Sequence, residues 1–240
     1  MKAIVIVPAY NEQDNIEKTL RDLAENGAGT DVLVMNDCST DGTEAVLKRL
    51  GASYLSFPVN LGIGGGVQAG YRYAKQRGYD IAIQFDGDGQ HDAKYLRSLI
   101  EPLERDEADI VIGSRFVTHE GFQSSGARRM GIGILSRLIH LLCGVKVLDV
   151  TSGMRAVNRR FIEEYAEHYA QDYPEPEALL YAGLRKARIR EVPVQMRERE
   201  NGKSSISAAR SIYYMVKVSL ALIIGRLGGR NKTTGMEREG

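Results

Sequence analysis

The sequence predicts an α/β protein in which a doubly wound, mostly parallel sheet carries helices on both faces. Short apolar runs rich in Ile and Val alternate along the chain with segments of helical periodicity. Several of these runs stop at clusters of Asp, Asn and Gly, as buried strands do where they open into loops. At 240 residues the chain is long enough for a well-buried core, and the repeated strand and helix pairs imply right-handed crossovers.

Short strands are expected wherever apolar, β-branched residues run together. They cover residues 3–7, 31–35, 53–57, 81–85, 110–112 and 189–196. Pro8 ends the first strand, and Pro193 places the last one at an edge, because proline cannot donate a hydrogen bond to a neighbouring strand. Apolar residues at helical spacing predict helices over residues 15–23, 44–50, 67–77 and 206–227.

Composition and charge are those of an ordinary folded protein. The chain is 43% hydrophobic with a formal net charge of +1, so no whole-protein field favours binding to nucleic acid. Cys38 and Cys143 lie far apart without metal-ligand spacing, which is typical of reduced thiols in a reducing compartment. No signal-peptide pattern precedes the first strand and no run of about 18 apolar residues occurs, so we expect a cytosolic chain without a membrane span.

The most informative stretch follows the strand at 81–85. Asp86, Asp88, Gln90 and His91 come close together, and the glycines between them allow a tight turn. Open α/β sheets bind ligands at the carboxyl ends of their strands. Two carboxylates with an amide or imidazole nearby suit Mg²⁺ or Mn²⁺ holding a substrate diphosphate. An Asp-Gly turn between a strand and a helix is the alternative interpretation.

Gly62 begins a glycine-rich segment, residues 62–66, ahead of the helix at 67–77. A dinucleotide-binding fingerprint is not supported, because the segment does not follow the first strand and lacks an acidic residue about twenty positions later. Two interpretations remain open. The backbone approaches a ligand phosphate or sugar closely, or the glycines simply allow a tight start to the helix.

Seven motifs in a fixed order resemble those of glycosyltransferase family 2, and within it those of the polyprenyl-phosphate (dolichol-phosphate-like) sugar synthases. They are residues 8–12 (PAYNE), 36–43 (NDCSTDGT), 60–64 (NLGIG), 86–91 (DGDGQH), 113–115 (GSR), 149–155 (DVTSGMR) and 199–204 (RENGKS). The resemblance implies the GT-A fold of nucleotide-diphospho-sugar transferases. It also implies inverting transfer from a UDP- or GDP-sugar, a Mg²⁺ or Mn²⁺ cofactor and a polyprenyl-phosphate acceptor.

The resemblance assigns residues to the donor side of the site. The nucleotide-sugar would contact Pro8, Tyr10, Glu12, Asp37, Gly62 and Asp86, with Asp37 receiving the base. The metal on the diphosphate would be held by Asp86, Asp88 and Gln90. The reaction itself requires such a metal. Breaking the bond from sugar to diphosphate builds negative charge, which a divalent cation and basic side chains stabilise.

Basic residues are the candidates for further contacts with the donor diphosphate. Arg199 and Lys203 flank Gly202 in a polar loop, and the resemblance places them at the diphosphate as catalytic residues alongside Asp88. Without the resemblance, the alternating charges of this loop indicate a solvated surface.

On the acceptor side, the resemblance implies that Arg115, Arg128 or Arg129 binds the phosphate of the lipid. Ser152 and Arg155, with Asp149, would close the same side of the site.

Glu177 lies in a Pro-Glu-Pro-Glu segment where many inverting family members carry a catalytic base. A phosphate monoester has a second pKa of about 6 and needs no base at neutral pH, whereas a sugar hydroxyl does. Glu177 therefore stays open between a base, an acceptor-site residue and a favourable charge at a helix N-terminus. Glu175 is a weaker candidate for the same roles.

Two apolar segments lie outside the motifs. Residues 130–142 are basic and apolar, which suits a helix at a membrane interface or one buried in the core. We expect a catalytic domain over residues 1–206 and an amphipathic helix over residues 207–227 that lies on a membrane, packs on the domain or mediates self-association. Residues 228–240 would form a mobile tail.

The leading expectation is a peripheral enzyme on the cytosolic face of the cell membrane that moves a sugar to polyprenyl phosphate. An alternative enzyme would transfer to a saccharide hydroxyl of a glycan or lipid-linked glycan, with Glu177 or Glu175 as base. A non-catalytic nucleotide-sugar-binding protein belongs to a different class, and the intact motifs argue against it.

Overall fold

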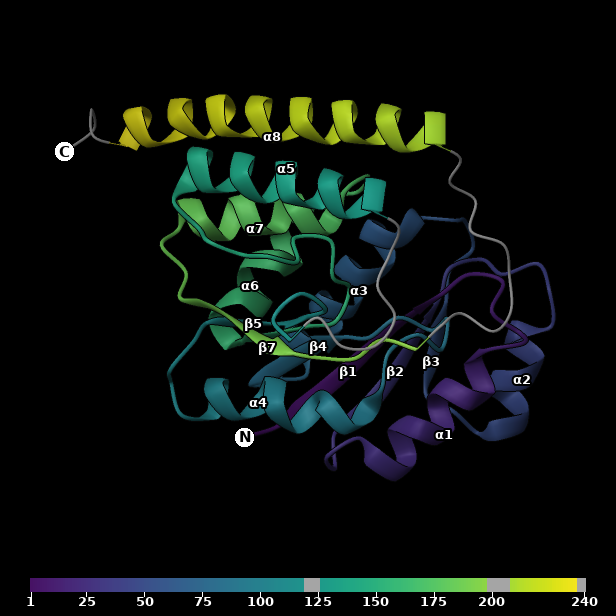
Figure 1. The fold of residues 1–240 in the computed structure, drawn as a ribbon. Helices are drawn as coiled ribbons and strands as arrows, with labels where there is room; N and C mark the ends of the chain where they lie inside the picture. Colours follow the sequence, from purple (N-terminus) through teal and green to yellow (C-terminus); the bar gives the residue numbers. More distant parts are fainter. Residues whose placement is uncertain (119–125, 198–207, 237–240) are drawn as a thin grey trace.

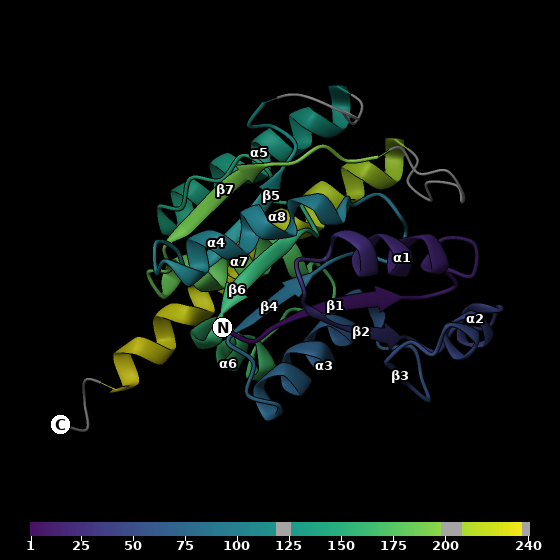
Figure 2. The ribbon, with the colours of Figure 1, turned by 90° about the horizontal axis from the view of Figure 1, so that it is seen from below.

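A seven-stranded mixed sheet forms the centre of the protein, in a computed structural model that describes residues 1–118, 126–197 and 208–236 (Figure 1). Its strands are β1 (Ala3–Ala9), β2 (Asp31–Asn36), β3 (Tyr54–Ser56), β4 (Ile81–Gln84), β5 (Ile110–Ser114), β6 (Arg155–Asn158) and β7 (Ile189–Pro193). Their order across the sheet is β3-β2-β1-β4-β6-β5-β7, which can be followed in Figure 2.

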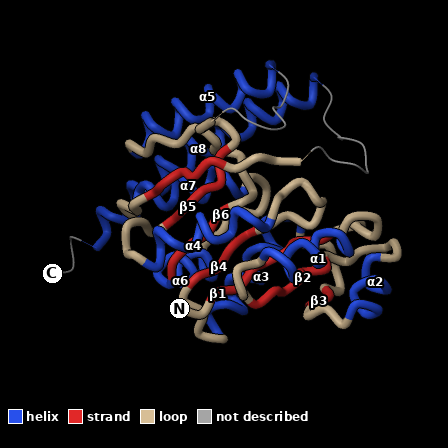
Figure 3. Tube along the Cα trace, turned by 60° about the horizontal axis from the view of Figure 1, so that its bottom comes forward, coloured by secondary structure: helices blue, strands red, loops and turns tan. Residues whose placement is uncertain are grey.

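Helices cover both faces of this sheet (Figures 1 and 3). One face carries α1 (Ile16–Asn26), α2 (Thr43–Leu50), the short 3-10 helix η1 (Ala93–Tyr95) and α4 (Leu96–Glu104). The other carries α3 (Gly62–Gln76), α5 (Gly126–Cys143), α6 (Arg159–Glu167), α7 (Pro174–Leu184) and α8 (Ala208–Met236). Alternate strand residues face opposite sides, so Ile4 and Ile6 join the core under α3 while Val5 and Val7 join the core under α1. This confirms the predicted doubly wound α/β class.

Helix α8 forms an outer layer on α5 and α7 (Figure 1). Its Val218 and Leu222 are fully buried in the core under these helices. The helix continues to Met236, past the predicted end at residue 227. Among the residues that the structure describes, no helix is both long and apolar enough to cross a bilayer.

Strand β6 is the strand that the sequence analysis does not anticipate. It lies between β4 and β5 and runs antiparallel to both, pairing Arg155 with Gln84 on one side and with Ile112 on the other. An antiparallel strand begins at the edge where its neighbours end, so the segment before β6 reaches the carboxyl end of β4. A strand of four residues that starts with arginine gives too little apolar pattern to be predicted.

Gly70 sets the distance between α3 and the sheet. A Cβ at this position would lie 2.3 Å from Cγ2 of the fully buried Ile6. We expect Gly70→Ala to lower the free energy of unfolding by about 1–3 kcal/mol, because overpacking must displace the helix or the strand. Gly133→Ala is the matched control, since its Cβ meets no atom within 4 Å and alanine favours a helix by up to about 1 kcal/mol. Urea unfolding measures both, and equal stability of the two variants would contradict this packing argument.

Candidate active site

The candidate site lies along the sheet edge where the parallel strands end. Strands β1, β2 and β4 run parallel to one another and finish at this edge. Each is followed by a residue that the sequence singled out: Tyr10 after β1, Asp37 after β2 and Asp86 after β4. Ligands of open α/β sheets bind at this kind of edge.

A cavity of about 370 Å³ opens there. Its lining residues come from four separate segments: Pro8, Ala9, Tyr10, Glu12, Asp37, Asn60, Gly62, Ile63, Gly66, Asp86, Gly87 and Asp88. Every residue that the resemblance assigned to the nucleotide-sugar belongs to this set, together with Asp88. The fold therefore brings the predicted donor-side residues to one place.

The loop before α3 wraps around Asp37. The Asp37 side chain is buried, and its Oδ1 accepts a hydrogen bond from the backbone N–H of Leu61 at 2.6 Å. Asn60 donates from Nδ2 to the Asp37 carbonyl oxygen at 3.2 Å and accepts from the Gly62 N–H at 3.0 Å. Gly62 has a φ of +73°, a left-handed conformation that favours glycine. The Asn-Leu-Gly sequence therefore fixes how the Asp37 carboxylate is turned.

The glycine-rich segment contributes to both the cavity and the packing of α3. Gly62 and Gly66 line the cavity. Gly64 serves packing instead, because a Cβ there would lie 2.1 Å from the carbonyl oxygen of Ala170.

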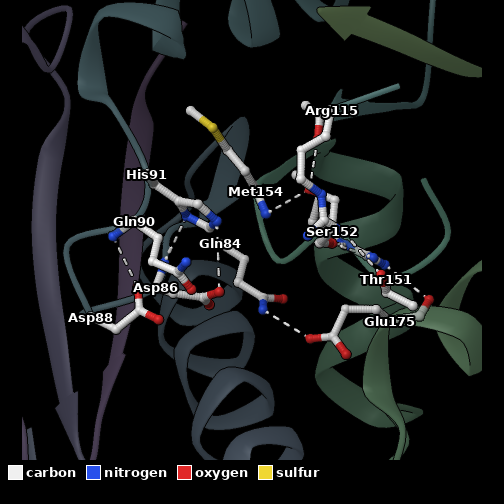
Figure 4. Close-up of polar contacts among 12 residues, drawn as sticks. Gln84, Asp86, Asp88, Gln90, His91, Arg115, Thr151, Ser152, Met154 and Glu175 are labelled. Carbon is white, nitrogen blue, oxygen red and sulfur yellow. Dashed lines mark hydrogen bonds and ion pairs between the residues drawn. The ribbon is translucent and has the colours of Figure 1, made fainter. Parts of the chain in front are cut away.

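His91 braces the turn that carries the two acids (Figure 4). Its buried ring accepts a hydrogen bond at Nδ1 from the Asp86 N–H at 3.1 Å, and its Nε2 lies 3.6 Å from Oδ2 of Asp86. Burial lowers the pKa of His91 to about 4, so the ring is neutral at physiological pH. Asp88 tightens the same turn by accepting from the Gln90 N–H at 3.1 Å. His91 is thus a structural residue here rather than an open ligand.

Asp86 and Asp88 are the two lining carboxylates that the resemblance assigns to a cation. Desolvation and the neighbouring Asp88 carboxylate raise the pKa of Asp86 to about 7, a repulsion that a divalent ion would relieve. The described parts of the chain hold no group of three or more His, Cys, Asp and Glu placed to bind a metal. Two carboxylates still fit Mg²⁺ or Mn²⁺, because such ions keep water and substrate phosphates in their shell. Gln90 does not belong to the cavity lining.

A buried hydrogen-bond chain joins the end of β4 to the start of α7 (Figure 4). Gln84 accepts from the Tyr169 hydroxyl at 3.2 Å and donates to Oε1 of Glu175 at 3.2 Å. Burial raises the pKa of Glu175 above its ordinary value. Glu177 is half-buried in the same helical turn, where burial and the Asp172 carboxylate raise its pKa. Glu175, the weaker candidate from the sequence, is therefore the one that contacts the strand leading to Asp86.

Ser152 and Arg155 hold the segment before β6 and do not line an open acceptor site. Arg155 is 1% exposed and donates to the carbonyl oxygens of Ser152 at 2.7 Å and Glu175 at 3.1 Å. The Ser152 hydroxyl is buried and donates to the Gly113 carbonyl at 2.6 Å. Because protein encloses both side chains, the geometry does not support their predicted contact with the acceptor.

Arg115 forms a buried ion pair with Asp149. Its Nε and Nη2 donate to the two carboxylate oxygens at 2.7 and 2.6 Å, and Nη2 also reaches Thr151 at 3.0 Å. Glu191 accepts from the backbone N–H of Asp149 at 2.9 Å. The ion pair ties Arg115 to the segment before β6. Its contact with an acceptor phosphate stays a prediction.

The other basic candidates lie away from this pair. Arg128 and Arg129 are in the first turn of α5, and the Arg129 side chain is exposed. Arg199 and Lys203 fall outside the described residues.

Gly153 and Gln84 are site residues that the predicted set does not contain. A Cβ at Gly153 would lie 2.3 Å from Oδ2 and 2.8 Å from Oδ1 of Asp86, so the missing side chain makes room for that carboxylate. Sequence signals exist for both: Gly153 lies inside the DVTSGMR motif, and Gln84 is polar within an apolar strand.

Solved structures share this fold. Glucosyl-3-phosphoglycerate synthase from Mycobacterium tuberculosis, in complex with phosphoglyceric acid, superposes with a TM-score of 0.70 at 21% identity, over 95% of this chain and 80% of that one. The same enzyme with Mn²⁺, UDP and glucosyl-3-phosphoglycerate gives 0.69 at 21% identity, over 95% and 80%. At such identity the likeness shows the fold alone. The observed architecture is therefore the GT-A fold that the resemblance implied.

Sequence comparison gives the family. The profile described as glycosyl transferase family 2 matches residues 4–166. Undecaprenyl-phosphate mannosyltransferase of Micrococcus luteus is 33% identical over 217 residues, covering 86% of this chain and 88% of the relative. A UDP-N-acetylglucosamine–dolichyl-phosphate N-acetylglucosaminyltransferase of Methanococcus voltae is 29% identical, covering 80% and 84%. This chain belongs to glycosyltransferase family 2, as the motifs predicted.

We expect Gly153→Ala to lower the kcat of sugar transfer by about 100-fold. The added methyl would push the Asp86 carboxylate aside, and a shift of about 1 Å at a reacting centre costs that much. Transfer rates and circular dichroism, with Gly133→Ala as the matched glycine substitution, measure the effect. A folded Gly153→Ala protein with unchanged kcat would show that the position of Asp86 does not matter.

Proposed function

We propose that the protein transfers a sugar, with inversion, from a UDP- or GDP-sugar to the phosphate of a polyprenyl phosphate, with Mg²⁺ or Mn²⁺, at the cytosolic membrane face. The observation that carries the proposal is the single cavity that gathers Tyr10, Asp37, Asp86 and Asp88. The names of the two relatives above support the acceptor, since each is a transferase for undecaprenyl or dolichyl phosphate. The Mn²⁺ and UDP named for the structural neighbour support the donor and the ion.

Different residues of the cavity would bind the base and the cation. Asp37 would receive the base, and the half-exposed ring of Tyr10 offers it an apolar surface. Asp86 and Asp88 would hold the cation, which stabilises negative charge on the departing diphosphate. An acceptor phosphate oxygen attacks the anomeric carbon, the bond to the donor diphosphate breaks, and the nucleoside diphosphate leaves. The phosphate is already ionised at neutral pH, so this step needs no base.

An exposed apolar stripe on the outer helical layer supports a membrane contact. On α8, residues spaced three and four apart are exposed: Tyr213, Val216, Leu220, Ile223, Ile224 and Leu227. Met130 and Ile134 extend the exposed apolar surface onto the neighbouring α5. Arg129 and Lys217 lie beside these residues and are exposed. An apolar stripe flanked by basic residues is the pattern of a helix at the surface of an anionic bilayer.

A saccharide hydroxyl is the second candidate acceptor. The partly buried carboxyl of Glu175, bonded to Gln84 on the strand that leads to Asp86, is the observation that favours it. A carboxylate so placed would take the proton that a hydroxyl loses when it attacks the sugar.

Transfer of labelled sugar to a short polyprenyl phosphate in anionic vesicles tests the main proposal. We expect Mn²⁺-dependent label in the organic phase from one UDP- or GDP-sugar, and we expect the protein to float with the vesicles. Asp88→Ala should reduce transfer by at least about 100-fold, whereas Asp14→Ala removes an equally charged but exposed residue outside the cavity and should retain it. Donor turnover without labelled lipid would contradict the phosphate acceptor, and nucleotide binding without any turnover would contradict an enzyme.

Glu175→Gln and Glu177→Gln separate the two acceptors. If phosphate is the nucleophile, neither substitution should reduce kcat by more than about tenfold, because no proton has to be removed. If a hydroxyl is the nucleophile, loss of the base should cost about 100- to 10,000-fold. We expect the first outcome with polyprenyl phosphate. Steady-state rates for both variants, with the wild type assayed in parallel, measure it.

A further inference from the structure

The turn over residues 86–91 receives two of its backbone contacts from Arg197, in the segment that follows β7. The Arg197 N–H donates to the Gln90 carbonyl at 2.8 Å, and its Nη1 donates to the His91 carbonyl at 3.4 Å. The Gln90 N–H donates in turn to a carboxylate oxygen of Asp88 at 3.1 Å (Figure 4). Gln90 therefore links Arg197 to the Asp88 carboxylate.

Two aspartates fix the guanidinium of Arg197. Its Nη1 lies 3.0 Å from Oδ2 of Asp22 on α1, and its Nη2 lies 3.1 Å from Oδ2 of Asp92, the residue that caps η1. Both aspartate side chains are largely buried. Asp22 also accepts from the Ala93 N–H at 3.0 Å, so one carboxylate holds both the guanidinium and the first residue of η1. The planar fork of arginine is suited to such a bridge.

The Arg197 side chain lies outside the cavity. Among the described residues, it lines a separate open groove along α1, together with Asp22, and it is absent from the cavity lining. Helix α1 supports the turn at a second point, because the Thr19 hydroxyl donates to the Gly87 carbonyl at 3.2 Å. Thr19 and Asp22 are three residues apart and so share one face of the helix. Arg197 therefore acts on the cavity through the turn, from its α1 side.

We propose that Arg197 is a positioning residue for the cation site. Its guanidinium ties the turn to α1 and η1, and the turn held in this place presents the Asp88 carboxylate to the cavity. The inference rests on the proposed function, in which Asp86 and Asp88 hold the cation, and it adds a residue outside the cavity on which that site depends. Loss of a group that orients metal ligands costs about 10- to 100-fold in metal affinity.

The sign of the effect separates positioning from simple electrostatics. Arg197→Met removes a positive charge near the turn and keeps an unbranched side chain. By Coulomb's law alone, this loss of positive charge would leave Mn²⁺ binding equal or make it tighter. Loss of position makes Mn²⁺ binding weaker. Arg197→Lys keeps the charge without the planar fork, so it should restore part of the affinity.

Arg188 provides a matched control at the opposite end of β7. It directly precedes this strand, whereas Arg197 follows it. Arg188 also bridges two aspartates, Asp106 and Asp109, and its side chain is 48% exposed against 35% for Arg197. Arg188→Met therefore removes the same kind of ion pair without a contact to the turn.

Hydrogen exchange and Mn²⁺ binding test the proposal. In the metal-free protein, we expect Arg197→Met to speed exchange of the amides at residues 86–93 by about tenfold. Electron paramagnetic resonance of free Mn²⁺ should show about tenfold weaker binding of the ion alone. Arg188→Met should leave both quantities within about twofold of the wild type, an estimate for a site without contact to the turn. Unchanged exchange and unchanged or tighter Mn²⁺ binding in a folded Arg197→Met protein would overturn the proposal.

The inference and the proposed function fail separately. A wild type that transfers sugar with Mn²⁺, while Arg197→Met keeps the exchange and the Mn²⁺ affinity of the wild type, retains the proposed function and loses this inference. A wild type that labels no lipid, while Arg197→Met alone loosens the turn and weakens Mn²⁺ binding, loses the proposed function and retains this inference.

Discussion

The buried guanidinium of Arg155 is the constraint on which the site depends. A charge at the first position of a central strand is stable only when its donors are satisfied, and leaving such a group unpaired costs about 3–5 kcal/mol. Here the carbonyl oxygens of Ser152 and Glu175 meet that requirement, and Tyr71, Tyr165 and Tyr169 surround the group. The loop before β6 and the first turn of α7 must therefore converge on one point. That point lies beside Gln84, at the end of the strand that leads to Asp86.

Apolar runs in the sequence predict most strands of the sheet, but they do not predict the central strand β6. The strands at 3–7, 31–35 and 81–85 are apolar runs with clear ends, and the structure forms each of them. Strand β6 carries Arg155 and Asn158 at its two ends, so its pattern is half polar, and only its place between β4 and β5 makes it a strand. Helix α8 shows the opposite case, since the helical signal is strong but its end at Met236 lies beyond the apolar segment.

The sequence was enough to predict that Tyr10, Asp37 and Asp86 lie together, because each follows a strand and parallel strands end at the same edge. It was not enough for the acceptor side, since Arg115, Ser152 and Arg155 have the chemistry of phosphate ligands but their orientation depends on tertiary contacts. Asp149 holds Arg115, and protein carbonyls hold Arg155. The sequence also does not show which of Glu175 and Glu177 contacts Gln84. That depends on how α7 packs against the sheet.

The contact between Gly153 and Asp86 limits how the loop before β6 can be engineered. This loop is short and precedes a strand, so exchanging it for a loop from a relative is an obvious experiment. Its glycine, however, lies directly against the Asp86 carboxylate. A grafted loop with any side chain at that position would displace this carboxylate from the cavity. Libraries built on this scaffold should keep residue 153 constant and vary the chain on either side of it.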